Sequence, residues 1–233
     1  MDYRIVTLEP VACLREGWAI VRDRYWLLLA ITVTGLIIGS LAPLGVLMGP
    51  MVCGIYICLF KRLKKEEIAF RDLFRGMDYF VQSLIATLVQ LVPIMAMTIP
   101  VNLLLALQFV KRVYTWMGGP YRELADMMGP REMFVIVAIA SVVVFLLSVF
   151  FGTFFMFSYP LIVDRKMRGW DAVKLSARAS RDNFRGAAVL MATTTLVSLL
   201  GSLVCYVGAF LVTPVTLAAW VVAYRRVFPE LAR

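Results

Sequence analysis

The residues most suited to chemistry in this sequence are five polar side chains within one long uncharged stretch, residues 79–110. If this stretch is a helix, all five lie within about 120° of one face, and they are Ser83, Thr87, Gln90, Thr98 and Asn102. Two prolines lie in the same stretch, and broken helices of this kind line substrate sites in some transporters because proline frees backbone carbonyls. The alternative, which we favour, is that these hydroxyls and amides hydrogen-bond to neighbouring helices, at roughly 0.6 kcal/mol each.

Other kinds of catalytic chemistry lack the residues that they need. The chain contains no histidine, and its uncharged stretches contain no carboxylate, which argues against zinc sites of the His-Glu-x-x-His kind, Ser-His-Asp triads and the usual proton relays. An interfacial lipid enzyme would have to use aspartates that alternate with basic residues, as solvated ion pairs do. These are Asp72, Asp78, Asp171 and Asp182. We therefore expect no enzyme, no cofactor and no metal site.

Composition and charge placement are typical of an integral membrane protein. Of the 233 residues, 61% are hydrophobic and 17% are charged, against roughly 45–50% and 25% in soluble domains. Every charged residue lies in 1–24, 61–78, 111–132, 164–185 or 225–233. A charge at the centre of the hydrocarbon core costs roughly 2.5–3.5 kcal/mol, so the stretches between are expected to cross the bilayer. The net charge of +9 then comes from basic residues that flank the spans, and we expect no nucleic-acid partner.

The lengths of the uncharged stretches indicate six spans, since a helix needs about 20 residues to cross a bilayer. The first and last stretches are too long for one helix, and each has a glycine-containing break, at GSLAPLG (39–45) and GSLVCYVG (201–208). We predict an all-α polytopic membrane protein in which two hairpins surround two long central helices. One membrane domain, 1–233, would hold spans at about 25–41, 45–60, 79–110, 133–163, 186–204 and 207–224.

Two of these spans end in the same way. GPMVCGIYICLFKR (49–62) and TPVTLAAWVVAYRR (213–226) each contain a small residue and a proline, then ten uncharged residues and a basic pair. Each is expected to be the outgoing helix of a hairpin that returns to the cytoplasm, so the sequence indicates two related hairpins. The basic pairs are expected to contact lipid headgroups, and they are Lys61, Arg62, Arg225 and Arg226.

Three charged segments, 8–24, 70–77 and 170–184, show helical amphipathicity next to a span. Their apolar faces are Val11, Leu14, Trp18 and Val21; Phe70, Leu73, Phe74 and Met77; and Trp170, Val173, Ala177 and Phe184. We predict short cytoplasmic helices at the membrane interface, accompanied by basic residues that bind anionic headgroups. These basic residues are Lys64, Lys65, Arg178 and Arg181. The alternative is a docking platform for a protein partner or a second copy of the chain.

Three stretches carry a resemblance: GPMVCGIYICLFKR, the following FRDLFRGMDYF, and YPLIVDRKMRGWDAVKLSARASRDNF. They resemble a loose group of bacterial six-helix membrane proteins of unknown function, similar to the membrane domain sometimes fused to glycerophosphodiester phosphodiesterases. The resemblance covers most of the chain through diffuse patterns, such as Gly-Pro before a span and Pro160 ahead of Asp164. It implies a bacterial inner-membrane location and no catalytic residues.

Together these patterns favour a non-enzymatic membrane protein that acts as a scaffold, an assembly factor or a lipid-organising factor. The alternative is a small transporter, or the membrane subunit of one, that uses the polar face of 79–110. Membrane lipids with anionic headgroups are the expected partners.

Membrane topology is the first testable prediction. With six spans, both termini and two of the loops share one side, which holds 20 of the 24 Lys and Arg residues, whereas the loop 111–132 holds four. Basic loops stay in the cytoplasm. Reporter fusions at residue 120 should therefore read periplasmic, and fusions at 67, 170 and 233 should read cytoplasmic. A cytoplasmic signal at residue 120 would contradict the six-span arrangement.

Overall fold

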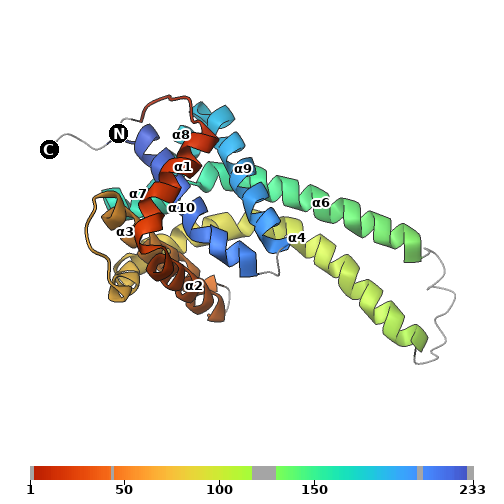
Figure 1. The fold of residues 1–233 in the computed structure, drawn as a ribbon. Helices are drawn as coiled ribbons and strands as arrows, with labels where there is room; N and C mark the ends of the chain where they lie inside the picture. Colours follow the sequence, from red (N-terminus) through yellow and green to blue (C-terminus); the bar gives the residue numbers. More distant parts are fainter. Residues whose placement is uncertain (1–2, 43–44, 117–129, 204–206, 230–233) are drawn as a thin grey trace. The chain divides into compact units, whose positions relative to one another are not determined.

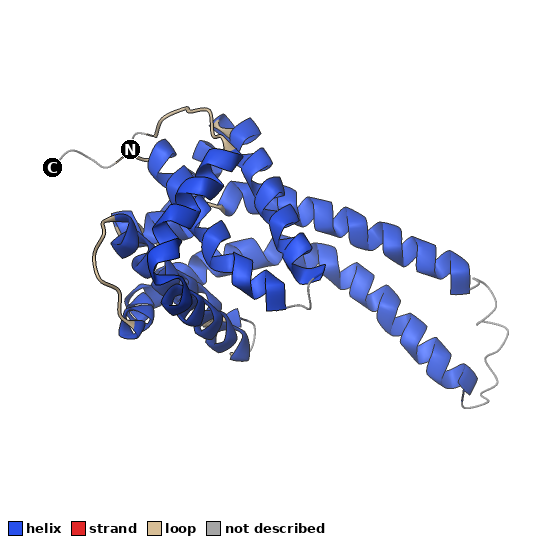
Figure 2. Cartoon of the chain, viewed as in Figure 1, coloured by secondary structure: helices blue, strands red, loops and turns tan. Residues whose placement is uncertain are grey.

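A computed structural model of the chain describes residues 3–42, 45–116, 130–203 and 207–229. Every regular element among these residues is a helix (Figure 2). In chain order (Figure 1) the elements are α1 (Pro10–Val21), η1 (Arg22–Arg24), α2 (Tyr25–Leu41), α3 (Met48–Leu63), η3 (Phe70–Tyr79), α4 (Phe80–Trp116), α6 (Pro130–Phe155), α7 (Ser158–Arg165), α8 (Gly169–Asp182), α9 (Phe184–Leu203) and α10 (Val207–Val227), where η marks a 3-10 helix.

Five helical stretches in the described residues are long and apolar enough to cross a membrane: Pro10–Leu41, Phe70–Leu107, Phe134–Arg165, Phe184–Leu203 and Val207–Val227. The predicted span that is missing from these five, 45–60, corresponds to α3, which has only 16 residues. At 1.5 Å per residue it is about 24 Å long, shorter than a hydrocarbon core of about 30 Å. The chain therefore has several potential membrane helices, and the exact count of six remains a prediction.

The chain forms two compact units. Unit 1 comprises 1–90 and 152–233, and α3 and α10 lie at its centre. The helix α3 packs against α2, η3 and α7, while α10 packs against α1, α2 and α9. The largest fully buried side chains include Tyr56 of α3 and Tyr224 of α10. The two stretches that the sequence singled out for their similar endings thus supply the core of this unit.

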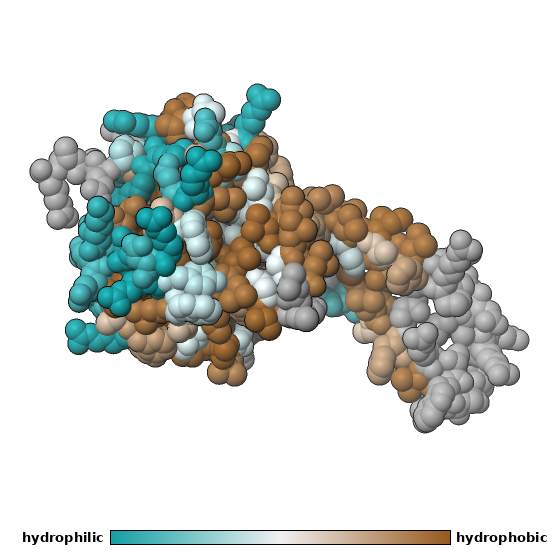
Figure 3. Space-filling view, in the orientation of Figure 1, coloured by the Kyte–Doolittle hydropathy of each residue, from teal (hydrophilic) through white to brown (hydrophobic). Residues whose placement is uncertain are grey.

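Unit 2, residues 91–151, consists of the rest of α4 and most of α6. Apolar side chains along both helices are exposed, among them Ile99, Leu103, Phe134 and Leu146, and brown atoms dominate this unit in Figure 3. Exposed apolar surface of this extent is unusual for a soluble monomer. It is the surface expected of helices in contact with lipid.

The predicted span 133–163 is interrupted. The helix α6 ends at Phe155 and α7 begins at Ser158, because Pro160 has no backbone N–H to donate to the carbonyl four residues earlier. The Ser176 hydroxyl of α8 compensates for the break: it donates to the carbonyl of Phe154 at 2.7 Å and accepts from the N–H of Phe157 at 3.2 Å. A single buried hydroxyl therefore bonds both to the end of α6 and to the residue that precedes α7.

The segment 70–77 adopts a 3-10 helix rather than an α-helix. With three residues per turn, Leu73 and Gly76 share one face while Phe74 and Met77 share the next. Leu73 is buried and Gly76 lies against α3, whereas Phe74 and Met77 are 47% and 42% exposed. The apolar face predicted for an α-helix is thus divided between the core and the surface.

The two other amphipathic segments are also divided. In α1 the buried positions are Cys13, Gly17 and Val21, and α1 packs on α10, where a Cβ on Gly17 would lie 2.7 Å from the N atom of Ala219. Val11 and Trp18 of the predicted apolar face are exposed. In α8, Val173 is buried with small residues, whereas Trp170 is 51% exposed. Each helix therefore packs on the rest of unit 1 mainly through small residues and leaves a tryptophan exposed at the surface.

Glycine allows η3 to reach the backbone of α3. A Cβ on Gly54 would overlap the carbonyl oxygen of Leu73, and a Cβ on Gly76 would overlap that of Pro50. Gly54→Ala should therefore destabilise the protein by about 1–3 kcal/mol, as overpacking of a fixed backbone does. The measurement is thermal unfolding in detergent, followed by helical circular dichroism.

Gly152→Ala is the matched control for this substitution. Its Cβ would approach only the flexible end of Met191, at 2.7 Å from Cε, so the loss should be much smaller. Equal destabilisation by the two variants would contradict the close packing of η3 on α3.

Candidate functional site

The two basic pairs meet in the structure. Phe60, which precedes the first pair, packs edge to face against Tyr224, which precedes the second, with ring centroids 5.6 Å apart. The guanidinium of Arg225 lies 5.0 Å from the centroid of the Phe60 ring, a distance at which a cation is attracted by an aromatic face. The ends of α3 and α10 therefore form one aromatic and basic cluster.

All four members of the basic pairs have a carboxylate partner within the chain. In the α3 pair, Lys61 bonds to Asp72 at 2.8 Å and Arg62 approaches Asp23 at 3.4 Å. In the α10 pair the partners lie on α7 and α1: Arg225 bonds to Asp164 at 2.9 Å and Arg226 bonds to Glu16 at 2.6 Å. We had expected these cations to contact headgroups. The structure gives each of them an internal role first, and headgroup contact remains a prediction.

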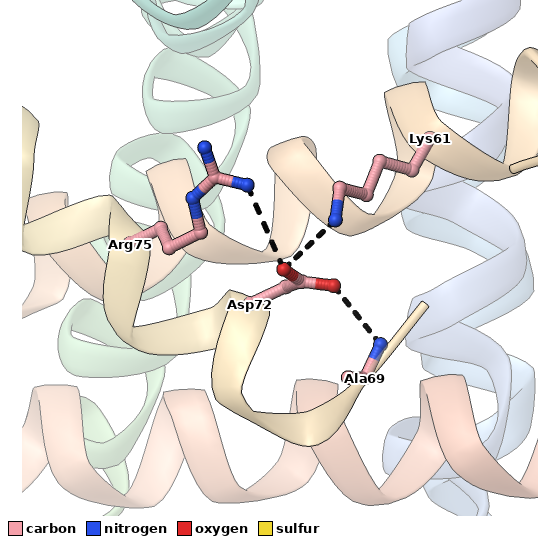
Figure 4. Close-up of polar contacts among 4 residues, drawn as sticks. All are labelled: Lys61, Ala69, Asp72 and Arg75. Atoms are coloured by element: carbon pink, nitrogen blue, oxygen red, sulfur yellow. Dashed lines mark hydrogen bonds and ion pairs between the residues drawn. The ribbon is translucent and has the colours of Figure 1, made fainter. Parts of the chain in front are cut away.

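Asp72 is the most buried of these carboxylates, and Figure 4 shows its contacts with Lys61, Ala69 and Arg75. Its side chain is 5% exposed, and Oδ1 accepts from Lys61 at 2.8 Å while Arg75 lies 3.8 Å away. Its Oδ2 accepts from the backbone N–H of Ala69 at 2.9 Å, immediately before η3 begins. One carboxylate therefore fixes the start of η3 and joins that element to the end of α3.

Asp164 of α7 has a similar role at the other pair. It accepts from both terminal nitrogens of Arg225, at 2.9 and 3.3 Å, and from the Tyr224 hydroxyl at 2.8 Å. A two-point guanidinium–carboxylate contact fixes orientation as well as distance. It holds α7 against the end of α10.

The N-terminal segment 3–8 is ordered by Asn183, a role that the sequence analysis missed. The Asn183 side chain accepts from the N–H of Val6 at 2.8 Å and donates to the carbonyl of Arg4 at 3.2 Å. Tyr3 also donates to Asp182, and this bond raises the pKa of the Tyr3 phenol because a phenolate would face a carboxylate. The only signal in the sequence is an asparagine between two helical patterns, where it commonly bonds to backbone.

The polar face predicted on 79–110 does not act as one unit. Ser83 and Thr87 are buried; Thr87 donates to the carbonyl of Ser83 at 2.8 Å and lies 3.0 Å from the hydroxyl of Tyr159 on α7. Thr98 and Asn102 lie in unit 2, where they bond to carbonyls of their own helix at 3.4 and 2.9 Å. Gln90 is the last residue of the first segment of unit 1, and its Nε2 is buried without a hydrogen-bond partner among the described residues.

A neighbouring amide that the sequence analysis did not select makes a contact between helices. Gln82 accepts from the N–H of Gly169 at 2.8 Å. It thus joins the start of α4 to the start of α8, and Gly169 packs there because a Cβ would overlap the Gln82 carbonyl. The observed polar contacts of α4 with other helices gather at its first two turns.

The other four of the eight cations expected to contact headgroups are exposed: Lys64, Lys65, Arg178 and Arg181. Among the described residues, none of them forms an ion pair. Within the same part of the chain, no cluster of cysteine and acidic side chains is arranged to hold a metal ion. These four cations are therefore available to a charged partner outside the chain.

The contribution of Asp72 can be measured directly. Asp72→Asn should destabilise the protein by about 2 kcal/mol or more, because it leaves Lys61 partly buried without its counter-charge. Thermal unfolding in detergent would report the loss. The matched control is Asp78→Asn in the same element, at an exposed position, which should change stability by less than about 0.5 kcal/mol. Similar losses of stability in the two variants would show that the buried Lys61–Asp72 ion pair contributes no more than an exposed carboxylate does.

Comparisons with known proteins give no guide to the function of this chain. No protein-family model, no curated protein and no solved structure matches this sequence. The arrangement of exposed cations, exposed aromatic residues and internally paired basic residues is therefore the basis for a functional assignment.

Proposed function

We propose that this chain is a non-enzymatic protein of the bacterial inner membrane, with both termini in the cytoplasm, that organises anionic lipid at the cytoplasmic surface. The observation that carries the proposal is that unit 1 exposes large apolar side chains next to unpaired cations. On η3, Phe74 and Met77 are exposed beside Arg71, which is also exposed. Helices that lie at a membrane interface have this composition.

The same combination recurs on α8. Trp170 is 51% exposed, and the ammonium of Lys174 lies 5.1 Å from the centroid of its ring. Arg178 and Arg181 follow at the exposed positions of the same helix. Tryptophan prefers the headgroup region of a bilayer, and each cation near an anionic surface contributes roughly 1 kcal/mol of attraction.

The division of η3 and α8 into buried and exposed faces supports attachment to a membrane. Leu73 and Val173 are buried within unit 1 together with small residues, whereas Phe74, Met77 and Trp170 are exposed. Figure 3 shows hydrophilic side chains gathered on one side of this unit, with apolar ones beside them. A surface of this kind fits a boundary between lipid and water.

Transport through the polar face of α4 has less support. Asn102 donates to its own helix, and Thr87 contacts Tyr159 between packed helices. The alternative interpretation of this stripe, hydrogen bonding to neighbouring helices, fits Thr87, whereas Thr98 and Asn102 bond within their own helix; neither kind of contact requires a substrate. A protein partner or a second copy of the chain is the alternative binding partner for the exposed cations.

Charge reversal tests the proposal. Lys64→Glu, Lys65→Glu, Arg178→Glu and Arg181→Glu together should remove most of the phosphatidylglycerol and cardiolipin that co-purify in mild detergent, because the attraction is electrostatic. Quantitative lipid mass spectrometry is the measurement. Circular dichroism should show unchanged helix content, because the four side chains are exposed.

The matched control exchanges the same cations without changing charge: Lys64→Arg, Lys65→Arg, Arg178→Lys and Arg181→Lys. This variant should retain the anionic lipids. If the reversed and the exchanged proteins carry equal amounts of anionic lipid, the proposal fails and a protein partner becomes the better explanation of the exposed cations.

A further inference from the structure

A cleft of about 350 Å³ opens on the surface of unit 1 between the end of α3, the following loop, η3 and the end of α7. Buried Phe60 and half-buried Val163 contribute apolar walls. Exposed charged side chains line it as well: Lys64, Glu66, Arg75 and Asp78. Its volume lies at the lower end of the range of roughly 300–1,000 Å³ for small-molecule sites, which suits a compact polar group.

Some of the charges in the cleft are already neutralised by the fold. Lys61 is held by Asp72 at 2.8 Å, and Asp164 is held by Arg225 and Tyr224. Arg75 lies 3.8 Å from Asp72, but its side chain is 60% exposed, so this contact leaves the guanidinium free to bond elsewhere.

Three lining charges have no internal partner. Within the described part of the chain, Lys64, Glu66 and Asp78 form no ion pair. The cleft therefore presents two cations, Lys64 and Arg75, together with two carboxylates, Glu66 and Asp78, that form no ion pair within the described part of the chain. This is a mixed pattern rather than a basic patch.

We propose that this cleft binds an ammonium-bearing phosphodiester, the chemistry of a phosphatidylethanolamine headgroup. Lys64 and Arg75 would hold the phosphate by charge-assisted hydrogen bonds, and Glu66 and Asp78 would accept N–H bonds from the ammonium. A simple anion would meet two carboxylates, and a simple cation would meet two basic groups, so only a ligand with both charges satisfies the whole lining.

The same arrangement selects a primary ammonium. Carboxylates bind an ammonium through its N–H groups, whereas quaternary ammonium groups are recognised by several open aromatic faces. The cleft holds Phe60 and Tyr79, but the ring of Phe60 already packs with Arg225 and Tyr224. Phosphatidylcholine should therefore bind more weakly than phosphatidylethanolamine.

The inference rests on the proposed function, because it names a second lipid class for the same surface. The two are separable through their residues. Anionic lipid retention depends on cations, whereas recognition of the ammonium depends on Glu66 and Asp78. Neutralising the two carboxylates should weaken ethanolamine binding and leave phosphatidylglycerol binding unchanged or stronger. Misfolding would not produce a loss confined to one lipid class.

The test uses the purified, delipidated full chain in detergent, with binding followed by native mass spectrometry. The added probes are short-chain phosphatidylethanolamine, phosphatidylcholine and phosphatidylglycerol, with glycerophosphoethanolamine and inorganic phosphate as soluble competitors. The proteins are the wild type, Glu66→Gln with Asp78→Asn, and Glu67→Gln. Glu67 is an exposed acid next to Glu66 that lies outside the cleft lining, so it controls for a general change in charge.

We expect the wild type and the Glu67→Gln control to bind phosphatidylethanolamine at least about tenfold more tightly than phosphatidylcholine. Loss of one hydrogen bond to a charged group lowers a binding affinity by about this factor or more. The double variant should lose this preference. Competition by glycerophosphoethanolamine would assign recognition to the headgroup alone, and its failure to compete would assign it to the intact lipid; both agree with the proposal.

Three results would overturn the inference: equal binding of the ethanolamine and choline lipids by the wild type, an unchanged preference in the double variant, or displacement of phosphatidylethanolamine by inorganic phosphate. Phosphatidylglycerol binding that survives in such an experiment would leave the proposed function in place.

Discussion

The contact between the ends of α3 and α10 organises unit 1. Phe60 and Tyr224 pack against each other at 5.6 Å, and the basic residues that follow them extend to carboxylates on the surrounding elements. Breaking a partly buried ion pair on one side leaves a charge uncompensated, which costs far more than a surface pair contributes. Each basic pair therefore ties two further elements to the central helices: η3 and η1 at one end, and α7 and α1 at the other.

Glycines and single polar side chains allow these elements to approach closely. Gly54 and Gly76 bring η3 onto the backbone of α3, and Gly17 does the same for α1 on α10. Where the chain breaks, a side chain bonds to backbone groups near the break: Ser176 near the α6–α7 interruption and Asn183 between α8 and α9. Buried backbone groups need such partners. On α1 and α8 small residues thus face the core, while Trp18 and Trp170 remain on the surface, where a lipid boundary can receive them.

The location of most helices followed from the sequence because the relevant signals are local. Charge-free stretches and glycine-containing breaks mark where a helix can run and where a hairpin turns. The interruption of the predicted span 133–163 and the 3-10 geometry of 70–77 were not predicted. The candidate site was less accessible. Nothing in the sequence places Glu66 beside Asp78, and only the packing of η3 and α7 on α3 gives them a shared cavity.

By itself, the sequence determined that the chain is helical, apolar enough for a membrane, and basic at the ends of its apolar stretches. These properties depend on residues close together in the chain. Tertiary structure decided which side of each amphipathic segment is buried, since Leu73 and Phe74 are neighbours that a 3-10 turn sends to different faces. It also decided the partners of the basic pairs, because Arg226 meets Glu16 across 210 residues of chain. Pairing at that separation depends on how the helices pack, which no local pattern encodes.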